Sequence, residues 1–242
     1  MPSRLHSTVA ELGWLNAGLY LLDLALRRLT SQRWCLRKYQ LVAQTLSGPS
    51  LAAGRGTDID VRLLASAAEL PPGYPRPAAV IADRYAQGAR SLAAFRGGEL
   101  TGFLWFLADA YQEDEVRVRF RLASPQAVWD FDVYVRPQDR LGWTFRRLWD
   151  EARATLSARG VHWSCSRISA FNAGSLRTHA RIGTAPLGCA VFLCCGGWQW
   201  MAATLAPYIH LSRHPASFPQ LLLDTTTLHH PLPPEAACRS TK

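Results

Sequence analysis

The chain has almost no lysine. Of its 27 lysine and arginine residues, 25 are arginine, and only Lys38 and Lys242 are lysine. So small a number argues against covalent catalysis through a lysine side chain and favours direct transfer chemistry. The arginines provide permanently charged, planar groups that suit phosphate, carboxylate or an anionic membrane surface. A GC-rich coding bias would produce the same composition, so the arginine content alone does not identify the partner.

Paired cysteines and long apolar runs are also missing. The six cysteines contain no C-x-x-C pair, so neither a zinc site nor a disulfide framework is indicated. The most apolar early stretch, residues 12–26, includes Asn16 and Asp23 and falls short of the ~20 apolar residues that a membrane span needs. No secretory signal is visible. We expect a reduced, cytoplasmic chain without a metal, and leave peripheral contact with a membrane open.

The N-terminal residues follow a helical pattern. Ser7 or Thr8 can cap a helix with Glu11 as the capping-box partner. An apolar stripe follows, and Arg27 and Arg28 end the helix where cations complement its dipole. The stripe consists of Leu12, Leu15, Leu19, Leu22 and Leu26. Two interpretations stay open: the helix packs on the domain behind it, or it contacts a membrane surface or a partner.

The rest of the chain alternates between strand and helix patterns. Residues 34–46 are expected to be extended and residues 48–57 to form a linker. The sequence predicts strands over 59–65, 91–95, 100–108, 116–122, 129–135, 161–171 and 187–195, and helices over 78–87, 141–159 and 173–182. We therefore predict an α/β fold with a mixed central sheet flanked by helices. Its parts are an N-terminal helix, extended segment and linker over 1–57, a domain over 58–212 and a loose tail over 213–242.

The most informative stretch begins where the 129–135 strand runs into the helix over 141–159. A helix N-terminus presents unpaired backbone N–H groups and the positive end of a dipole, which together favour phosphate. The nearby cations are Arg136, Arg140, Arg146 and Arg147, and Gly142 lies in the loop. This junction predicts an anion-binding site.

From here to Gly183 the sequence resembles the GCN5-related N-acetyltransferase (GNAT) superfamily. The resemblance covers residues 59–193 and rests on the order of Pro137, Arg140, Gly142, Leu148, Gly160, Asn172, Ser175 and Gly183. It implies a GNAT-like fold with an extra N-terminal helix and a C-terminal extension. The cofactor loop diverges, because Leu141, Trp143 and Phe145 replace the family's usual glycines.

The same resemblance implies where acetyl-CoA, or another acyl-CoA, would bind. The pyrophosphate would lie against a loop that contains Arg136, Arg140, Gly142, Trp143 and Thr144. Backbone N–H groups near Val133 and Val135 would polarise the thioester carbonyl. Asn172, with Ser175, would lie near the pantetheine arm.

Three residues are candidates for proton transfer. His179 follows Asn172 by seven positions, where many family members have the tyrosine that protonates the departing thiolate; a histidine pKa near neutral suits this role. Asp130 and Asp132 are expected on one strand face with Tyr134, either as a base or cationic-amine site or as a solvated face. An ordered water is the alternative base.

The function expected from these features is acyl-CoA-dependent N-acylation, most simply N-acetylation, of a small-molecule or peptide amine. Two alternatives stay open: a non-catalytic GNAT-like module, and a peripheral membrane protein with a basic, apolar face. No helix-turn-helix, zinc finger or RNA-binding aromatic pattern is found, so nucleic acid is not an expected partner. The acceptor, the acyl chain length and the oligomeric state are left open by the sequence.

Overall fold

A computed structural model describes residues 4–181 and 183–228, and it divides the chain into two compact units. Unit 1 contains residues Met1–Gln44, Ala110–Ala123 and Cys165–Thr225. Unit 2 contains residues Thr45–Asp109, Ser124–Ser164 and Thr226–Lys242. The predicted α/β class is confirmed. Both units draw residues from the predicted 58–212 domain, so each is described by itself below.

Unit 2 is built on an antiparallel sheet with strand order β7-β4-β3-β2. The strands are β2 (Ile59–Leu64), β3 (Arg90–Arg96), β4 (Glu99–Leu107) and β7 (Ala127–Val135). The predicted hairpin joins β3 to β4, where Gly97 and Gly98 both have positive φ, as the tight turn requires. The predicted strands over 59–65, 91–95, 100–108 and 129–135 are confirmed to within two residues at either end.

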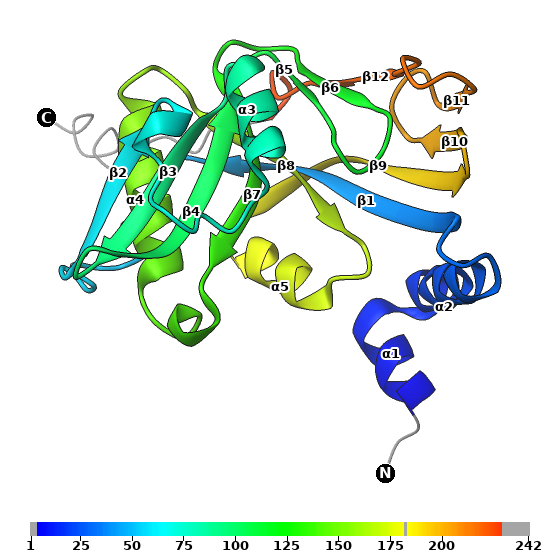
Figure 1. Ribbon diagram of the computed structural model, residues 1–242, viewed down its shortest axis with the longest axis horizontal. Helices are drawn as coiled ribbons and strands as arrows, with labels where there is room; N and C mark the ends of the chain where they lie inside the picture. The colour runs from blue at the N-terminus through cyan, green and yellow to red at the C-terminus, as the bar shows by residue number, and fades with distance from the viewer. Residues whose placement is uncertain (1–3, 182, 229–242) are drawn as a thin grey trace, which may run out of the picture. The chain divides into compact units, whose positions relative to one another are not determined.

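Two helices cover the opposite faces of this sheet, α4 (Thr144–Ser157) on one and α3 (Ala78–Ala86) on the other (Figure 1). The apolar stripe of α4 contributes Leu148, Trp149, Ala152 and Leu156 to the buried core of the unit. Leu92, Leu104, Phe106 and Val128 are among the strand residues that complete this core. Two short 3-10 turns, η1 (Ala67–Glu69) and η2 (Pro137–Asp139), precede α3 and α4.

Unit 1 contains a sheet with strand order β11-β10-β9-β1-β8 and the helix α5 (Ala173–Arg181). Its strands are β1 (Trp34–Thr45), β8 (Trp163–Ser169), β9 (Thr184–Cys195), β10 (Trp198–Ala203) and β11 (Ile209–Ser212). The last residue of β1 and the first two of β8 belong to unit 2. The expected extended segment over 34–46 is confirmed as β1, which pairs antiparallel with β9 along its length.

A second, small sheet in unit 1 was only partly expected. It has the order β12-β6-β5 and consists of β5 (Ala110–Gln112), β6 (Arg119–Leu122) and β12 (Gln220–Leu223). The predicted strand over 116–122 is therefore shorter than its alternating pattern. The expectation of a loose tail from 213 is wrong at β12, because Leu221 and Leu223 are fully buried and the strand pairs in parallel with β6. Residues 229–242 of that tail lie outside the described residues.

The N-terminal segment forms two helices, α1 (Arg4–Leu12) and α2 (Trp14–Leu29), where one was expected. The break falls at Gly13, whose φ of 76° is left-handed and suits glycine. Ser7, Thr8 and Glu11 lie inside α1, so the predicted capping box is wrong. Within the residues that the structure describes, no helix is long and apolar enough to cross a membrane.

Candidate functional site

Strand β7 contains a β-bulge that the sequence did not reveal. Trp105 of β4 pairs with Phe131, but Phe103 pairs with Tyr134, so β7 has one extra residue in this interval. Asp132 lies within it and has a φ of 49°, in the left-handed region. A bulge leaves its extra residue outside the hydrogen-bond ladder and re-aims the following side chains.

The bulge places the two predicted carboxylates on opposite faces of the sheet. Asp130 pairs in register with Phe106, which belongs to the core under α4. Asp132 instead reaches the α3 side, where Arg84 of that helix binds it. The prediction that Asp130 and Asp132 share a strand face is therefore wrong, because the extra residue interrupts the strict alternation of side chains.

Two arginines hold the Asp132 carboxylate. Arg76 donates from both Nε, at 2.6 Å, and NH2, and Arg84 donates from NH1 at 2.5 Å. Burial alone would raise the pKa of Asp132, but the hydrogen bonds from the two guanidinium groups outweigh it and hold this pKa below its usual value. Asp132 is therefore ionised at neutral pH and carries less charge than its two partners together.

Aromatic rings surround these ion pairs and form, with them, an arginine–aromatic cluster. The Arg76 guanidinium lies 5.1 Å from the ring centre of Phe103, and the Arg84 guanidinium lies 5.4 Å from that of Trp105. Such contacts favour a cation over an aromatic face. The cluster consists of Asp132 with Arg76, Arg84, Phe103, Trp105, Phe131 and Tyr134.

Asp130 has different surroundings. It is buried, and its carboxylate accepts a hydrogen bond of 2.7 Å from the hydroxyl of Ser164. Both residues belong to unit 2, Asp130 on β7 and Ser164 at the start of β8. The contact ties the first residues of β8 to β7, which is a structural role that needs no substrate.

The loop after β7 is held by a buried carboxylate. Asp139, in η2, accepts 2.7 Å and 2.9 Å hydrogen bonds from Arg136 and from Arg96 of β3. Arg136 is thus engaged within the protein. Arg140 is exposed, and its Nε donates to the backbone oxygen of Val135 at 3.4 Å.

The first turn of α4 has no side-chain cap. The first helical hydrogen bond runs from the backbone N–H of Arg147 to the carbonyl of Trp143, so the N–H groups of Thr144, Phe145 and Arg146 precede it. The Thr144 side chain does not point to solvent; it is buried, with its hydroxyl 3.4 Å from that of Thr101.

Trp143 packs inward beside this helix start. The guanidinium groups of Arg55 and Arg146 both lie over its ring, at 5.0 Å and 4.5 Å from the ring centre. Its Cβ comes so close to Gly56 that a Cβ at position 56 would lie 2.6 Å away. The bulk of Trp143 is therefore accommodated by a glycine elsewhere in unit 2. Val133 also packs against the α4 core.

Three of the predicted site residues lie in unit 1. Asn172 caps α5 as predicted, because its side-chain oxygen accepts a 3.0 Å hydrogen bond from the Ser175 N–H. His179 is half-buried, and burial lowers its pKa. Within the part of the chain that the structure describes, its buried Nδ1 has no hydrogen-bond partner.

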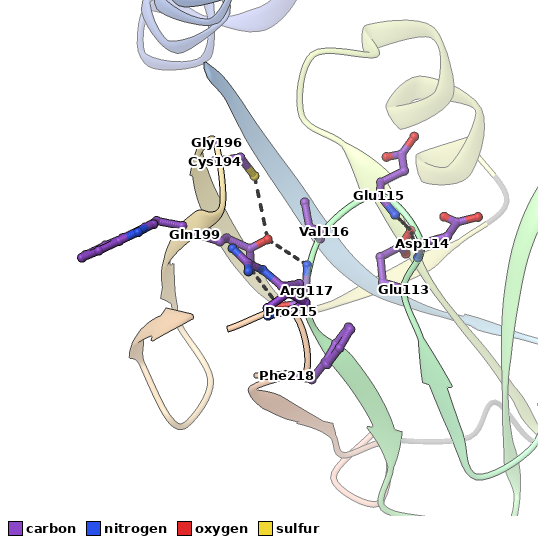
Figure 2. A pocket seen from close by; sticks show the side chains of 11 residues that line it. Glu113, Asp114, Glu115, Val116, Arg117, Cys194, Gly196, Gln199, Pro215 and Phe218 are labelled. Carbon is purple, nitrogen blue, oxygen red and sulfur yellow. Dashed lines mark hydrogen bonds between the residues drawn. The ribbon is translucent and has the colours of Figure 1, made fainter. Parts of the chain in front are cut away.

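Unit 1 also has a cavity of about 400 Å³ between the loop after β5 and the β9–β10 hairpin. Figure 2 shows Glu113 and Glu115 from the loop, and Cys194 and Gln199 from the hairpin. Gln199 bonds both the N–H and the carbonyl of Arg117 at 2.8 Å, and Glu113 accepts two hydrogen bonds from Arg167. These polar groups are engaged in joining the loop to the sheet, so we assign no ligand to the cavity.

The residues that the sequence failed to identify are Arg76, Arg84 and Asp139. Arg76 belongs to the loop PPGYPRP and Arg84 to a short helix, and neither has a motif spacing. The hydrogen bonds from Arg76 and Arg84 to Asp132 depend on the bulge, and no glycine in the sequence indicates that bulge. Over residues 4–181 and 183–228, no group of three or more His, Cys, Asp or Glu side chains is arranged to hold a metal ion.

Comparison with known proteins gives distant structural likenesses. No family model and no curated protein matches the sequence. A conserved protein of unknown function from Staphylococcus epidermidis is 9% identical with a TM-score of 0.43, covering 71% of this chain and 66% of that one. A tandem GNAT protein from the clavulanic acid biosynthesis pathway is 14% identical with a TM-score of 0.43, covering 69% and 54%. A putative GNAT-family acetyltransferase from Novosphingobium aromaticivorans is 13% identical with a TM-score of 0.39, covering 65% and 70%.

The chain spans about two thirds of the length of the first of these structures and about half of the second. Acetyltransferases of the GNAT family are thus among the structural neighbours of this chain, all at TM-scores below 0.5. Likenesses at this level do not assign the chain to a family.

Proposed function

We propose that the chain is an acyl-CoA-dependent N-acyltransferase, most simply an N-acetyltransferase, that passes the acyl group directly to a small-molecule or peptide amine. The observation that carries this proposal is the junction between β7 and α4. There a bulged strand leads into a helix whose first N–H groups have no side-chain cap. Two exposed arginines, Arg140 and Arg146, flank this helix start.

The junction has the chemistry that a pyrophosphate requires. The N–H groups of Thr144, Phe145 and Arg146 offer fixed donors at the positive end of the helix dipole. Arg140 and Arg146 add charged donors that match phosphate oxygens. Asp139 already binds Arg136, so Arg136 stabilises the loop and is not proposed to contact phosphate. Gly142 and Trp143 complete the loop, with the indole of Trp143 in contact with Arg55 and Arg146.

Acyl transfer also requires a hydrogen-bond donor for the thioester carbonyl, and the bulge in β7 is where we expect it. Acyl-CoA supplies a thioester whose carbonyl becomes more reactive when a hydrogen bond polarises it. A bulge leaves its extra residue outside the ladder, and we propose that a backbone N–H near Val133 or Val135 donates that bond. Preorganised donors of this kind stabilise developing negative charge on oxygen.

The proton-transfer roles follow from the surroundings of each group. Asn172, Ser175 and His179 belong to unit 1, so their expected roles at the pantetheine arm and the departing thiolate stay predictions. The depressed pKa of Asp132 makes it a poor base. We therefore propose that Asp132 is a positioning residue that fixes Arg76 and Arg84, that Asp130 anchors β8 through Ser164, and that an ordered water accepts the proton of the amine.

The proposal is tested first by cofactor binding. Acetyl-CoA at about 100 times its Kd should stabilise the fold by about 2.7 kcal/mol. This corresponds to a rise in Tm of about 5–10 °C for a chain of this size. AMP, which has the adenine but no pyrophosphate, serves as the control for non-specific binding of an adenine nucleotide, and longer acyl-CoAs test the length of the acyl group.

Turnover is the second readout. Incubation with acetyl-CoA and a panel of amines should release free thiol in proportion to acylated amine. Absence of stabilisation by any acyl-CoA would overturn the proposal. Stabilisation without thiol release by any amine would support a non-catalytic GNAT-like module instead.

A further inference from the structure

The solvent-facing side of α2 is apolar. Trp14 and Leu29 are 79% and 82% exposed, and the other exposed leucines are Leu15, Leu21, Leu22 and Leu24. Around the helix axis these residues share one half of the surface, where Gly18, Ala25 and Arg28 are also exposed. An ordinary surface helix has its polar residues on this side, whereas Arg28 is the one charged residue on the exposed half of α2.

The adjoining sheet of unit 1 shows a matching apolar face. One row of paired residues across β1, β9 and β10 consists of Trp34, Cys195 and Trp198. The next row on the same face extends to β11 and consists of Leu36, Leu193, Trp200 and Leu211. Trp198, Trp200, Ile209 and Leu211 of this face are exposed. The opposite face is buried, with Phe192 and Met201 fully inaccessible. The exposed aromatics are therefore confined to one side of the sheet.

Helix α2 lies on that same side. Lys38, in the row after Leu36, donates from Nζ to the side chain of Asn16 at 2.9 Å. Asp23 accepts a 2.8 Å hydrogen bond from the backbone N–H of Leu36. The outer half of α2 and the exposed residues of β10 and β11 thus belong to one side of unit 1. We call this the apolar face: Trp14, Leu15, Leu21, Leu22, Leu24, Leu29, Trp34, Trp198, Trp200, Ile209 and Leu211.

The charge of unit 1 indicates what covers this face. Unit 1 has 13 lysine and arginine residues against 6 aspartate and glutamate residues, a net of +7, whereas the whole chain has +9. Residues 184–212, which contain β9 to β11, include no acidic residue. Asp23 is neutralised by Arg27. Unit 1 is therefore strongly basic, and strands β9 to β11 bring no negative charge to the apolar face.

Exposed arginines border the apolar face directly. Arg28 is exposed on α2, Arg33 is exposed just before β1, and the Arg213 guanidinium lies 5.2 Å from the ring centre of Trp198. Leucines with interfacial tryptophans and arginines are the composition of helices that lie in a membrane surface. Anionic lipid headgroups would complement the net +7, which a second copy of the same basic face would not.

We propose that unit 1 docks on an anionic phospholipid membrane through the apolar face, with α2 parallel to the surface and Arg28, Arg33 and Arg213 against the headgroups. The leucines and tryptophans enter the boundary between headgroups and acyl chains. The attraction has two components, burial of apolar side chains and attraction of arginine to lipid phosphate, and these are separable by mutation and by salt.

The test is sedimentation of the full chain with vesicles, without acyl-CoA or amine, so that it is independent of the proposed enzymatic function. Binding to vesicles of equal parts phosphatidylglycerol and phosphatidylcholine is compared with binding to vesicles of phosphatidylcholine alone. Binding should require phosphatidylglycerol and weaken as salt is raised.

Variants then separate the two components. Leu22→Gln with Leu29→Gln should weaken binding about tenfold or more, because each leucine loses its burial in the lipid. The control Leu222→Gln changes an exposed leucine of β12 and should have no effect. Arg28→Gln with Arg213→Gln should weaken binding about fivefold per arginine, whereas Arg121→Gln on β6 should not. Circular dichroism confirms that each variant is folded.

Failure to bind the anionic vesicles at low salt would overturn the proposal. Equal loss of binding in the control variants would also overturn it, since the attraction would then be non-specific. Concentration-dependent dimerisation that the leucine variants abolish, without vesicle binding, would show that a second copy covers the face and would refute the membrane assignment.

Discussion

Replacing Asp132 by asparagine removes the carboxylate that Arg76 and Arg84 share. Asparagine keeps the size of the side chain and tolerates the left-handed φ of 49° at this position, so the backbone need not change. The Arg84 side chain is only 7% exposed and that of Asp132 15%. Breaking a buried ion pair by removing one partner costs about 3–5 kcal/mol, because the remaining charge stays buried without compensation. We expect Asp132→Asn to lower the free energy of unfolding by this amount.

The matched control is Asp60→Asn, which breaks an exposed pair with Arg62 in the same unit. Exposed pairs contribute about 0–1 kcal/mol. Urea denaturation followed by circular dichroism measures both free energies of unfolding. A cost for Asp132→Asn no larger than that for Asp60→Asn would refute the reasoning that the cluster depends on this carboxylate.

The stability that Asp132 contributes through its ion pairs depends on pH. The pKa of Asp132 is lowered in the folded state, so the unfolded state binds its proton at a higher pH. The stabilisation is therefore complete above the unfolded pKa of about 3.9 and is lost as pH falls through the lower folded value. The Asp132→Asn variant should lose less stability than the wild type between pH 5 and pH 3 (roughly the window around the reference aspartate pKa). An equal loss would contradict this assignment.

Three further predictions concern single residues. Burial lowers the pKa of His179, so its contribution to stability should be present above about pH 6.5 and lost as pH falls; His179→Gln should reduce that loss in denaturant titrations, and an equal loss in the variant would contradict the assignment. Leu148→Ala in the fully buried core should cost about 2–5 kcal/mol by the same method, against almost nothing for the exposed Leu141→Ala; similar costs would contradict the described core. Asn172→Ala should cost about 1 kcal/mol through loss of the α5 cap, and Asn172→Ser should restore most of it; no recovery would argue against capping.

Local chemistry made much of the fold predictable. The alternating strands of the β2–β3–β4–β7 sheet, the turn at Gly97 and Gly98, and the cap at Asn172 all depend on residues a few positions apart in the sequence. The strand β12 was missed because Leu221 and Leu223 stand in a stretch rich in threonine and proline, and its partner β6 is about one hundred positions away. The break at Gly13 was missed because the leucine pattern continues across it.

The candidate site was less accessible to sequence reasoning. Its binding of an anion stays a prediction, but its place at the join between a strand and a helix, with Arg136 and Arg140 in the loop, was predictable. Its geometry was not, because the bulge at Asp132 moves one carboxylate to the other face and nothing in the local sequence requires it. Asp132 binds arginines of α3 and the loop before it, and Asp139 binds Arg96 of β3 as well as the nearby Arg136. The contacts with α3, its preceding loop and β3 arise only from the tertiary fold.

The central claim is that the β7–α4 junction binds the phosphates of an acyl-CoA, and calorimetric titration with acetyl-CoA tests it most directly. The account predicts binding to the wild-type chain, weakened about tenfold for each arginine removed in Arg140→Ala and Arg146→Ala, because each supplies a charged hydrogen bond to phosphate. Arg159→Ala removes an exposed arginine beyond the other end of α4 and should leave the affinity unchanged. Absence of binding to the wild-type chain, or equal affinity in all three variants, would contradict the account.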